Sequence, residues 1–304
     1  MAIADPHWPR ADEWLASASP SPTLVVAGVP CSVASLTPSR ADLAPGEMRE
    51  ALGRFSVFDS ESGQRLDQLA VLDRGDWDLQ WLDTPASQQG IAERAAGLVE
   101  SHSGPGPVFC FLGGDNAITR PLLNGLRAGR LTASALLTFD AHHDVRTLDR
   151  GPTNGTPVRG LIEDGLEGTH IAQVGIHSFA NSSEYRAYCE SNGIRVYTME
   201  MVDRWGIEDV VGSALDELGK LAEWIHVDFD IDVLDAAFAP GCPGARPGGM
   251  TSRQLARAAF ACGSNAKVRS ADFVEVDPSQ DPTGITVMNM ANVFLAFASG
   301  VAAR

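Results

Sequence analysis

Short, continuously apolar segments recur through the 304-residue chain, and each is bounded by glycine, proline or an acidic residue. In order they are TLVVAGVP, VFCFLGG, ASALLTFD, HIAQVGI, IRVYTM, WIHVDFDIDVLD and VRSADFVEV. Segments that are apolar at consecutive positions are typical of strands buried on both faces of a parallel sheet, whereas half-exposed strands alternate. This feature predicts a sheet whose two faces are both covered.

Segments of helical character lie between these predicted strands. They are GIAERAAGLVESH, TRPLLNGLRAG, NSSEYRAYCESNG, VVGSALDELGKLAEW and TSRQLARAAFACG. Three of them carry residues that favour a helix start, at Thr119 with Pro121, at 181–183 and at Thr251 with Ser252. Strand alternating with helix along the whole chain predicts one doubly wound α/β domain over residues 1–304.

The charge balance argues against two classes of partner. Lysine and arginine number 23 against 39 acidic residues, a formal net charge of −16, whereas nucleic acids and anionic membranes require a basic face. No basic segment followed by an apolar stretch opens the chain, and no apolar run reaches the roughly 18–20 residues that span a bilayer. The five cysteines show no paired spacing, which is typical of reduced thiols. We expect a cytoplasmic protein without nucleic-acid or membrane partners.

Polar residues follow four of the predicted strands at the point where each strand ends. They are 113–116 after VFCFL, 140–144 after SALLTF, 230–235 after WIHV and Glu275 after ADFV. The carboxyl ends of parallel strands form one crevice in a doubly wound sheet. We therefore expect these four groups of residues to converge on one site.

Two of these segments place acidic residues at alternate positions, which point to the same side of an extended chain. The first contains Asp140, His142 and Asp144, and the second contains Asp228, Asp230 and Asp232, followed by Asp235. Each acid alone would be explained by a cap or a solvated turn. Together they would repel one another unless a cation held them.

An oxygen-rich set of ligands with one imidazole suits Mn²⁺ better than structural zinc, which prefers sulfur and nitrogen. The acids outnumber what one ion needs, so we expect two ions that share carboxylates. Two such ions, roughly 3.5–4 Å apart, would acidify a bridging water and generate hydroxide near neutral pH.

Four segments resemble the signature blocks of the ureohydrolase family, which includes arginase, agmatinase and formiminoglutamase. They are GGDNAIT, DAHHD, DFDIDVLD with APG, and EVDP, and they occur in the family's order between about Gly28 and Thr286. The resemblance implies a three-layer α/β/α arginase-like fold around a mostly parallel, roughly eight-stranded sheet. It also implies a binuclear Mn²⁺ site and a homo-oligomer that acts on a small amidine or guanidine.

The resemblance also implies roles for individual residues. Asp140 and Asp230 would bridge the two ions, His142 and Asp232 would complete one of them, and Asp144 would bind the other. Glu275 lies where the family uses a glutamate to hold the amidine or guanidine nitrogens of the substrate. Asp144 would in addition pass a proton to the departing nitrogen.

Two positions depart from the family pattern. Asn116 stands where the family has the metal-binding histidine of GGDH, and its neutral amide oxygen is a weaker ligand for Mn²⁺. We expect the neighbouring ion to bind loosely or to be missing. Asn154 stands where arginase and agmatinase have a proposed proton-shuttle histidine. These changes leave a catalytically degenerate, ligand-binding protein as an alternative, although Glu275 and the other five metal ligands are kept.

The substrate is suggested by Arg146, because the pattern DAH-x-D-x-R followed by x-G-T-P-x-R resembles formiminoglutamase. N-formimidoyl-L-glutamate carries two carboxylates, which guanidinium groups bind in bidentate fashion. Agmatine has no carboxylate and a cationic tail, which an arginine would repel. The sequence favours hydrolysis of N-formimidoyl-L-glutamate to L-glutamate and formamide. Hydrolysis of agmatine or a guanidino acid is the alternative within the family.

Three residues each allow two interpretations, and a fourth is expected to lie away from the site. Arg146 either anchors a substrate carboxylate or supports a metal-binding acid. Arg159 contacts the substrate or is a surface residue at a helix start, and His177 lines the pocket or is a loop histidine with its own partners. His143 points away from His142 and is expected to pack behind the site.

Overall fold

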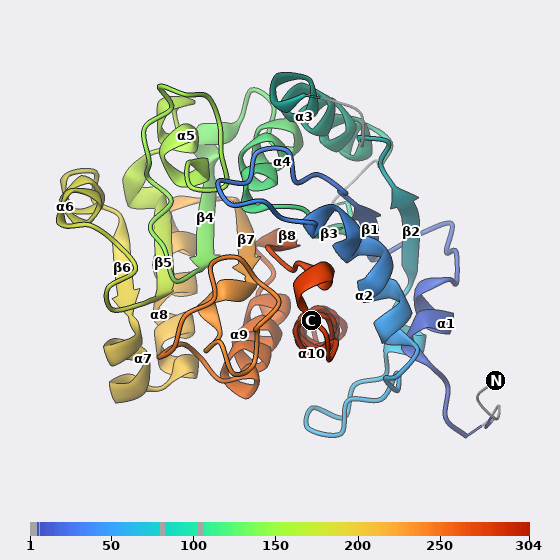
Figure 1. Ribbon diagram of the computed structural model, residues 1–304. Helices are drawn as coiled ribbons and strands as arrows, with labels where there is room; N and C mark the ends of the chain where they lie inside the picture. Colours follow the sequence, from blue (N-terminus) through green and yellow to red (C-terminus); the bar gives the residue numbers. More distant parts are fainter. Residues whose placement is uncertain (1–4, 6, 80–82, 103–105) are drawn as a thin grey trace.

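The computed structural model describes residues 5, 7–79, 83–102 and 106–304. Eight parallel strands form one sheet in the order β2-β1-β3-β8-β7-β4-β5-β6 (Figure 1). The strands are β1 (Leu24–Gly28), β2 (Val71–Asp76), β3 (Val108–Leu112), β4 (Ser134–Phe139), β5 (Ile171–Ile176), β6 (Arg195–Thr198), β7 (Trp224–Asp230) and β8 (Val268–Val274). The predicted eight-stranded α/β fold is confirmed.

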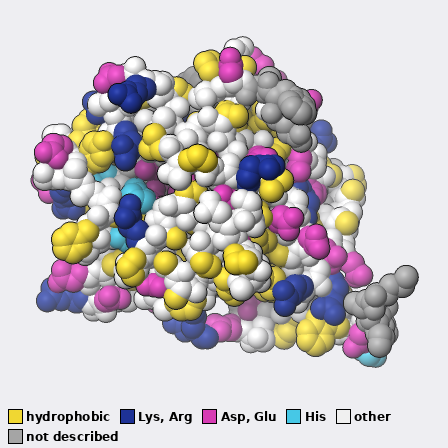
Figure 2. Space-filling view, in the orientation of Figure 1, with side chains coloured by type: hydrophobic (Ala, Val, Ile, Leu, Met, Phe, Trp, Pro, Cys, Tyr) yellow, Lys and Arg dark blue, Asp and Glu magenta, His cyan; other side chains and the backbone are white. Residues whose placement is uncertain are grey.

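Helices cover both faces of the sheet and bury three clusters of apolar side chains, one on one face and two on the other. One face packs against α3 (Thr84–Glu100), α4 (Thr119–Leu126), α5 (Pro157–Glu163) and α6 (Ser183–Ser191). The other packs against α1 (Ala11–Leu15), α2 (Ala44–Leu52), α7 (Met199–Trp205), α8 (Ile207–Leu221), α9 (Ser252–Ser264) and α10 (Ile285–Ala302). Acidic and basic side chains are interspersed over the face drawn in Figure 2.

A ladder of phenylalanines fixes the register of the three central strands. Phe139, Phe229 and Phe273 are paired across β4, β7 and β8, with ring centroids 5.1 and 5.2 Å apart. Phe294 and Phe297 of α10 meet these rings edge-on. A slip by one residue would move every side chain of a strand to the opposite face. The ladder therefore determines which residues emerge together at the ends of β4 and β7.

The edge strand β2 was not among the segments predicted from apolar runs. It pairs only with β1 in the sheet order, and most of its side chains are half-buried or exposed. Asp73 and Asp76 of this strand bind Arg49 of α2, with the Arg49 Nε lying 2.7 Å from Asp73 Oδ2. An edge strand with charged side chains lacks the continuous apolar signal of the buried strands.

All five predicted helices are present, as α3, α4, α6, α8 and α9. Ser182 caps α6, and Thr251 forms a capping box with Gln254 at the start of α9. Helix α4 begins at Thr119, as predicted, with Pro121 in its first turn, and the preceding 3₁₀ turn is capped by the side chain of Asp115. The other five α-helices of the described residues, α1, α2, α5, α7 and α10, were not predicted.

The C-terminal helix α10 also corrects the expectation that no apolar run is long enough to cross a bilayer. Its 18 residues have a mean hydropathy of 1.6, enough by length and composition alone. About 67% of this helix is buried inside the protein, mainly against α9 and α2. Apolar residues lie on all sides of α10 rather than along one face, which is typical of a helix in the core of a protein.

Close packing of α9 against α10 depends on glycine. A Cβ atom added at Gly300 would lie 2.2 Å from the Phe260 carbonyl oxygen, whereas one added at Gly212 of α8 would meet no atom within 4 Å. We expect Gly300→Ala to lower the free energy of unfolding by about 1–3 kcal/mol through overpacking. The matched change Gly212→Ala should raise it by up to about 1 kcal/mol through helix propensity. Denaturant unfolding measures both, and equal effects would contradict this description of the interface.

Candidate metal centre

The polar residues that follow β3, β4, β7 and β8 meet at the carboxyl end of the sheet, as predicted. Most of them line one cavity of about 160 Å³. Its lining residues are Leu36, Thr37, His142, Asp144, Arg146, Asn154, Gly155, Asp230, Asp232, Pro243, Gly244, Arg246 and Glu275. Asp140 and Asn116 are buried and directly bonded to this group.

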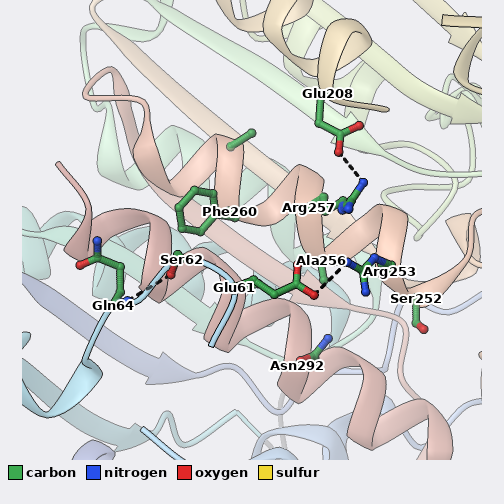
Figure 3. Close-up of a pocket in the computed structure, with 12 residues that line it drawn as sticks. Glu61, Ser62, Gln64, Glu208, Ser252, Arg253, Ala256, Arg257, Phe260 and Asn292 are labelled. Atoms are coloured by element: carbon green, nitrogen blue, oxygen red, sulfur yellow. Dashed lines mark hydrogen bonds and ion pairs between the residues drawn. The ribbon is translucent and has the colours of Figure 1, made fainter. Parts of the chain in front are cut away.

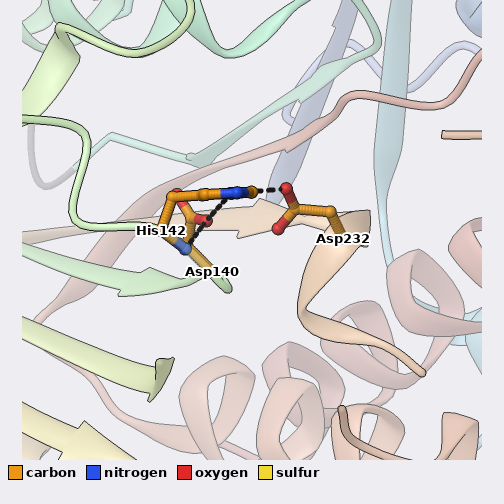
Figure 4. A group of neighbouring side chains, drawn as sticks. All are labelled: Asp140, His142 and Asp232. Atoms are coloured by element: carbon orange, nitrogen blue, oxygen red, sulfur yellow. Dashed lines mark hydrogen bonds and ion pairs between the residues drawn. The ribbon is translucent and has the colours of Figure 1, made fainter. Parts of the chain in front are cut away.

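His142 joins the acids of two strands. Its Nδ1 lies 2.8 Å from Asp232 Oδ2 and 3.5 Å from Asp140 Oδ1 (Figure 4). The charge of Asp232 raises the pKa of His142 to about 12. Burial favours the neutral form of Asp232, but the charge and hydrogen bond of His142 outweigh it and hold the pKa of Asp232 at about 2. The imidazole therefore behaves as the cation of this group.

Three carboxylates, one of them Asp140, converge on the amide of Asn116. The Asn116 Nδ2 donates to Asp144 Oδ2 at 2.9 Å, to Asp230 Oδ2 at 3.4 Å and to Asp140 Oδ2 at 3.5 Å. Burial, followed by the charges of neighbouring carboxylates, raises the pKa of Asp140 to about 6 and those of Asp144 and Asp230 well above their ordinary value. Burial and crowding therefore oppose the ionisation of these carboxylates, and the single imidazolium does not offset this effect.

These ligands fit a hard divalent cation such as Mn²⁺. The donors are carboxylate oxygens with one imidazole, and the buried carboxylates are destabilised by one another. Asn116 faces them with its nitrogen, while its Oδ1 accepts a hydrogen bond from Thr119 Oγ1 at 2.8 Å. To offer its oxygen to a cation the amide must turn over, after which the Thr119 hydroxyl can accept from the amide nitrogen.

Glu275 is held in an unusual backbone conformation and aimed into the cavity. Its φ is 65°, in the left-handed region, and Asp144 also has a positive φ of 53°. Non-glycine residues in this region cost roughly 1 kcal/mol or more, so they persist only where surrounding bonds impose them. Glu275 Oε1 accepts from the Asn116 backbone N–H at 2.7 Å and from Asn154 Nδ2 at 3.1 Å. Burial and the charge of Asp115 nevertheless raise the pKa of Glu275 to about 8.

Asn154 connects Glu275 to a segment that the sequence did not implicate. Its Oδ1 accepts from the Leu36 backbone N–H at 3.0 Å, and its own N–H donates to the Ala34 carbonyl. The buried Asp115 holds the same segment through the Ala34 N–H and Ser35 Oγ. Residues 34–37 thus form one wall of the cavity. Nothing in their composition points to this role, which depends on contacts between distant parts of the chain.

Arg146 is one of the residues that line the cavity. Its N–H donates to the Gly155 carbonyl at 2.9 Å, and a Cβ added at Gly155 would lie 2.6 Å from Arg146 Cδ. The side chain therefore lies across Gly155, and no residue of the described ranges forms an ion pair with its guanidinium. This arrangement does not fit the alternative in which Arg146 supports a metal-binding acid.

Arg159 and His177, for each of which the sequence left a substrate contact and a structural role open, are not among the residues that line the cavity. The Arg159 guanidinium lies over Tyr188, 4.6 Å from the ring centroid, and its Nε donates to Glu163 at 3.2 Å. His177 is buried, with Nε2 3.0 Å from the Val233 carbonyl oxygen. Both have the structural role that the sequence left open as the alternative.

His143 packs behind the site, as expected. Its Nδ1 lies 2.7 Å from Gln173 Oε1, and its backbone N–H donates to Asn181 Oδ1. The sequence missed Arg246, Pro243 and Gly244, which reach the cavity from the loop after Asp235.

A larger hollow of about 650 Å³ lies elsewhere, between α9, α10 and residues 61–64 (Figure 3). Two exposed ion pairs border it, Arg257 with Glu208 at 2.8 Å and Arg253 with Glu61 at 2.9 Å. Exposed pairs of this kind are ordinary surface features. The concentration of buried carboxylates identifies the smaller cavity as the candidate site.

Known proteins that are similar to this chain in sequence are also similar to it in fold. The chain matches the arginase family over residues 22–299. Formimidoylglutamase of Halalkalibacterium halodurans is 40% identical over 275 residues, covering 90% of this chain and 85% of that protein. The crystal structure of formimidoylglutamase from Bacillus subtilis has a TM-score of 0.93 and 33% identity, covering 99% of this chain and 94% of that one. A Trypanosoma cruzi formiminoglutamase crystallised with Mn²⁺ shares the fold, with a TM-score of 0.87 and 20% identity over 98% of this chain and 99% of that one.

Because the carboxylates repel one another, the assignment of the metal centre can be tested by measuring stability, without measuring activity. We expect Asp230→Asn to stabilise the protein in the presence of a chelator, because it removes a buried ionisable group. It should also remove most of the stabilisation by Mn²⁺, which for the unmodified protein amounts to about 2.7 kcal/mol at 100 times the dissociation constant. Thermal unfolding with chelator and with Mn²⁺ measures both effects.

Asp228→Asn is the matched control for Asp230→Asn. Asp228 lies on the same strand and is buried, but it does not line the cavity. This variant should keep the stabilisation by Mn²⁺. Loss of that stabilisation in the control alone would contradict the assignment of the metal centre.

Proposed function

The chain belongs to the arginase family, and we propose that it is a Mn²⁺-dependent hydrolase that converts N-formimidoyl-L-glutamate and water to L-glutamate and formamide. The observation that carries this proposal is that one cavity is lined both by the carboxylates of Asp144, Asp230 and Asp232, which form its floor, and by Arg146, which forms part of its wall. The acids suit a metal-assisted hydrolysis, and Arg146 suits an anionic substrate. The formimidoylglutamases of 33–40% identity over most of the chain support the choice of substrate.

The proposed metal ligands are the six residues that the sequence suggested. Two Mn²⁺ ions would be held by Asp140 and Asp230 together with His142 and Asp232 on one side and Asp144 and Asn116 on the other. When bound, the ions would lower the pKa of the attacking water and balance the charge of the carboxylates. The site that includes Asn116 would be the weaker of the two, because a neutral amide oxygen replaces a stronger ligand.

The remaining residues orient the substrate and move a proton. The Glu275 carboxylate would hold the amidinium group, in the orientation that the Asn116 N–H and the Asn154 amide impose on it. Water adds to the amidine carbon, the bond from this carbon to the glutamate nitrogen breaks, and that nitrogen gains a proton. Asp144, which faces the cavity, would deliver this proton. Arg146 would bind a carboxylate of the glutamate part.

A panel of substrates with added Mn²⁺ tests the reaction. We expect the kcat/KM for N-formimidoyl-L-glutamate to exceed those for arginine, agmatine, guanidinobutyrate and guanidinopropionate by about 10-fold or more, the discrimination that one well-placed charged contact provides. A preference for agmatine would mean that Arg146 does not face the substrate. Absence of turnover with every substrate after Mn²⁺ loading would favour the degenerate, ligand-binding alternative.

Asn116→His tests the assignment of the weaker ion. Imidazole is a stronger ligand than a neutral amide, so we expect this variant to bind Mn²⁺ more tightly at one site and to remain active. Titration with Mn²⁺, followed by measurement of bound metal after gel filtration, gives the affinity of each site. An unchanged affinity would remove Asn116 from the ligand set, and a collapse of activity would mean that the amide is matched to the substrate.

A further inference from the structure

We propose that Arg246 is a second carboxylate anchor, so that the pocket selects amidines that carry two carboxylates. Arg146 and Arg246 would bind one carboxylate each. This inference rests on the proposed function and specifies how its substrate is recognised. Arg246 was not suggested by any sequence motif, and it reaches the cavity from the loop of residues 241–250.

This loop lies directly against the metal-centre acids. A Cβ added at Gly244 would be 2.2 Å from Asp232 Oδ2, so the backbone at Gly244 is in contact with that carboxylate. Arg246 follows two residues later and lines the same cavity as Asp232 and Arg146. The contact therefore brings the loop that carries Arg246 to the wall of the cavity, whose floor is acidic.

Several hydrogen bonds fix the backbone on both sides of Arg246. The Arg246 carbonyl accepts from the Ala236 N–H at 2.9 Å, and Asp235 Oδ2 accepts from the Gly248 N–H at 2.7 Å. The Gly241 carbonyl accepts from the Asp277 N–H at 2.8 Å. The position of the residue is thus determined by the turn that follows β7, while its side chain is exposed and extends from a fixed base.

Both arginines have unpaired guanidinium groups among the described residues, although acids are abundant in this chain. Other arginines of the molecule are paired, for example Arg49 with Asp73 and Arg120 with Asp164. Arg146 lies across Gly155 on the segment after β4, and Arg246 belongs to the segment after β7. Two separate segments therefore each contribute one arginine without an ion pair to the lining of the same cavity.

The chemistry of N-formimidoyl-L-glutamate fits two separate anchors. Its α-carboxylate is attached to the carbon next to the amidine nitrogen, and its γ-carboxylate lies three carbons further along the chain. A guanidinium binds one carboxylate through two parallel hydrogen bonds, so one arginine does not serve both groups. In a protein with a net charge of −16, local cations are also needed to attract an anionic substrate end.

A comparison of three substrates with three variants tests this inference. The substrates are N-formimidoyl-L-glutamate, N-formimidoyl-2-aminobutyrate, which lacks the γ-carboxylate, and N-formimidoyl-4-aminobutyrate, which lacks the α-carboxylate. The variants are Arg146→Gln, Arg246→Gln and, as control, Arg253→Gln, whose side chain is exposed and lines the distant hollow at α9. The Mn²⁺-loaded full chain is used throughout, and unfolding temperatures establish that each variant folds.

We expect Arg246→Gln to lower kcat/KM for N-formimidoyl-L-glutamate by about 10- to 100-fold, as expected for loss of a charge-assisted hydrogen-bond pair. The same variant should leave kcat/KM unchanged for whichever of the two analogues lacks the carboxylate that Arg246 binds. Arg146→Gln should spare the other analogue, and Arg253→Gln should behave as the unmodified protein. A loss that is equal for all three substrates, or no loss at all, would overturn the assignment of Arg246.

Calorimetric binding of L-glutamate, the proposed product, separates this inference from the proposed reaction. If the unmodified protein hydrolyses N-formimidoyl-L-glutamate and Arg246→Gln changes neither turnover nor glutamate binding, the anchor fails and the reaction stands. If no formimidoyl substrate is hydrolysed but Arg246→Gln weakens glutamate binding by about 10-fold or more, the reaction fails and the anchor stands. If neither turnover nor glutamate binding is detected, both are rejected.

Discussion

The repulsion among buried carboxylates at the ends of β4 and β7 is the constraint on which the site depends. Asp140, Asp144 and Asp230 all approach the amide of Asn116, and burial raises the pKa of each. Such an arrangement is unfavourable in a folded chain unless a cation compensates it, because each buried charge loses its hydration. The arrangement persists because the sheet beneath it is rigid. A stable scaffold thus holds together groups that would otherwise separate, which makes them available to a divalent ion.

The rigidity comes from the apolar side of the same strands. The stacked rings of Phe139, Phe229 and Phe273 fix the register of β4, β7 and β8, and α10 packs against them. Because side chains alternate along a strand, this register also places Asp140 and Asp230 at neighbouring strand ends on the opposite face. The core and the site are therefore two consequences of one alignment. A change that shifted a central strand would disturb the carboxylates without touching them.

The walls of the cavity depend on a different principle, which is the attachment of loops to the strand ends. Asn154 binds both Glu275 and the backbone of Leu36, and it therefore links two walls of the cavity. The loop with Arg246 is attached through Gly244 and the turn after β7. In the proposed reaction the acidic residues on the floor would hold the metal ions, and the arginines of the walls would select the substrate. The two can vary separately, since they belong to different segments.

The sequence by itself determined the fold class and the residues on the floor of the cavity. It also determined five of the helices, which are α3, α4, α6, α8 and α9. These features are local: a buried strand is continuously apolar, and alternate acids behind it face one way. Only the tertiary structure revealed the polar edge strand β2, the apolar helix α10 and the cavity walls. It also removed Arg159 and His177 from the cavity and added Arg246. Their positions depend on which loops pack together over long distances in the chain, and no local pattern of residues encodes that packing.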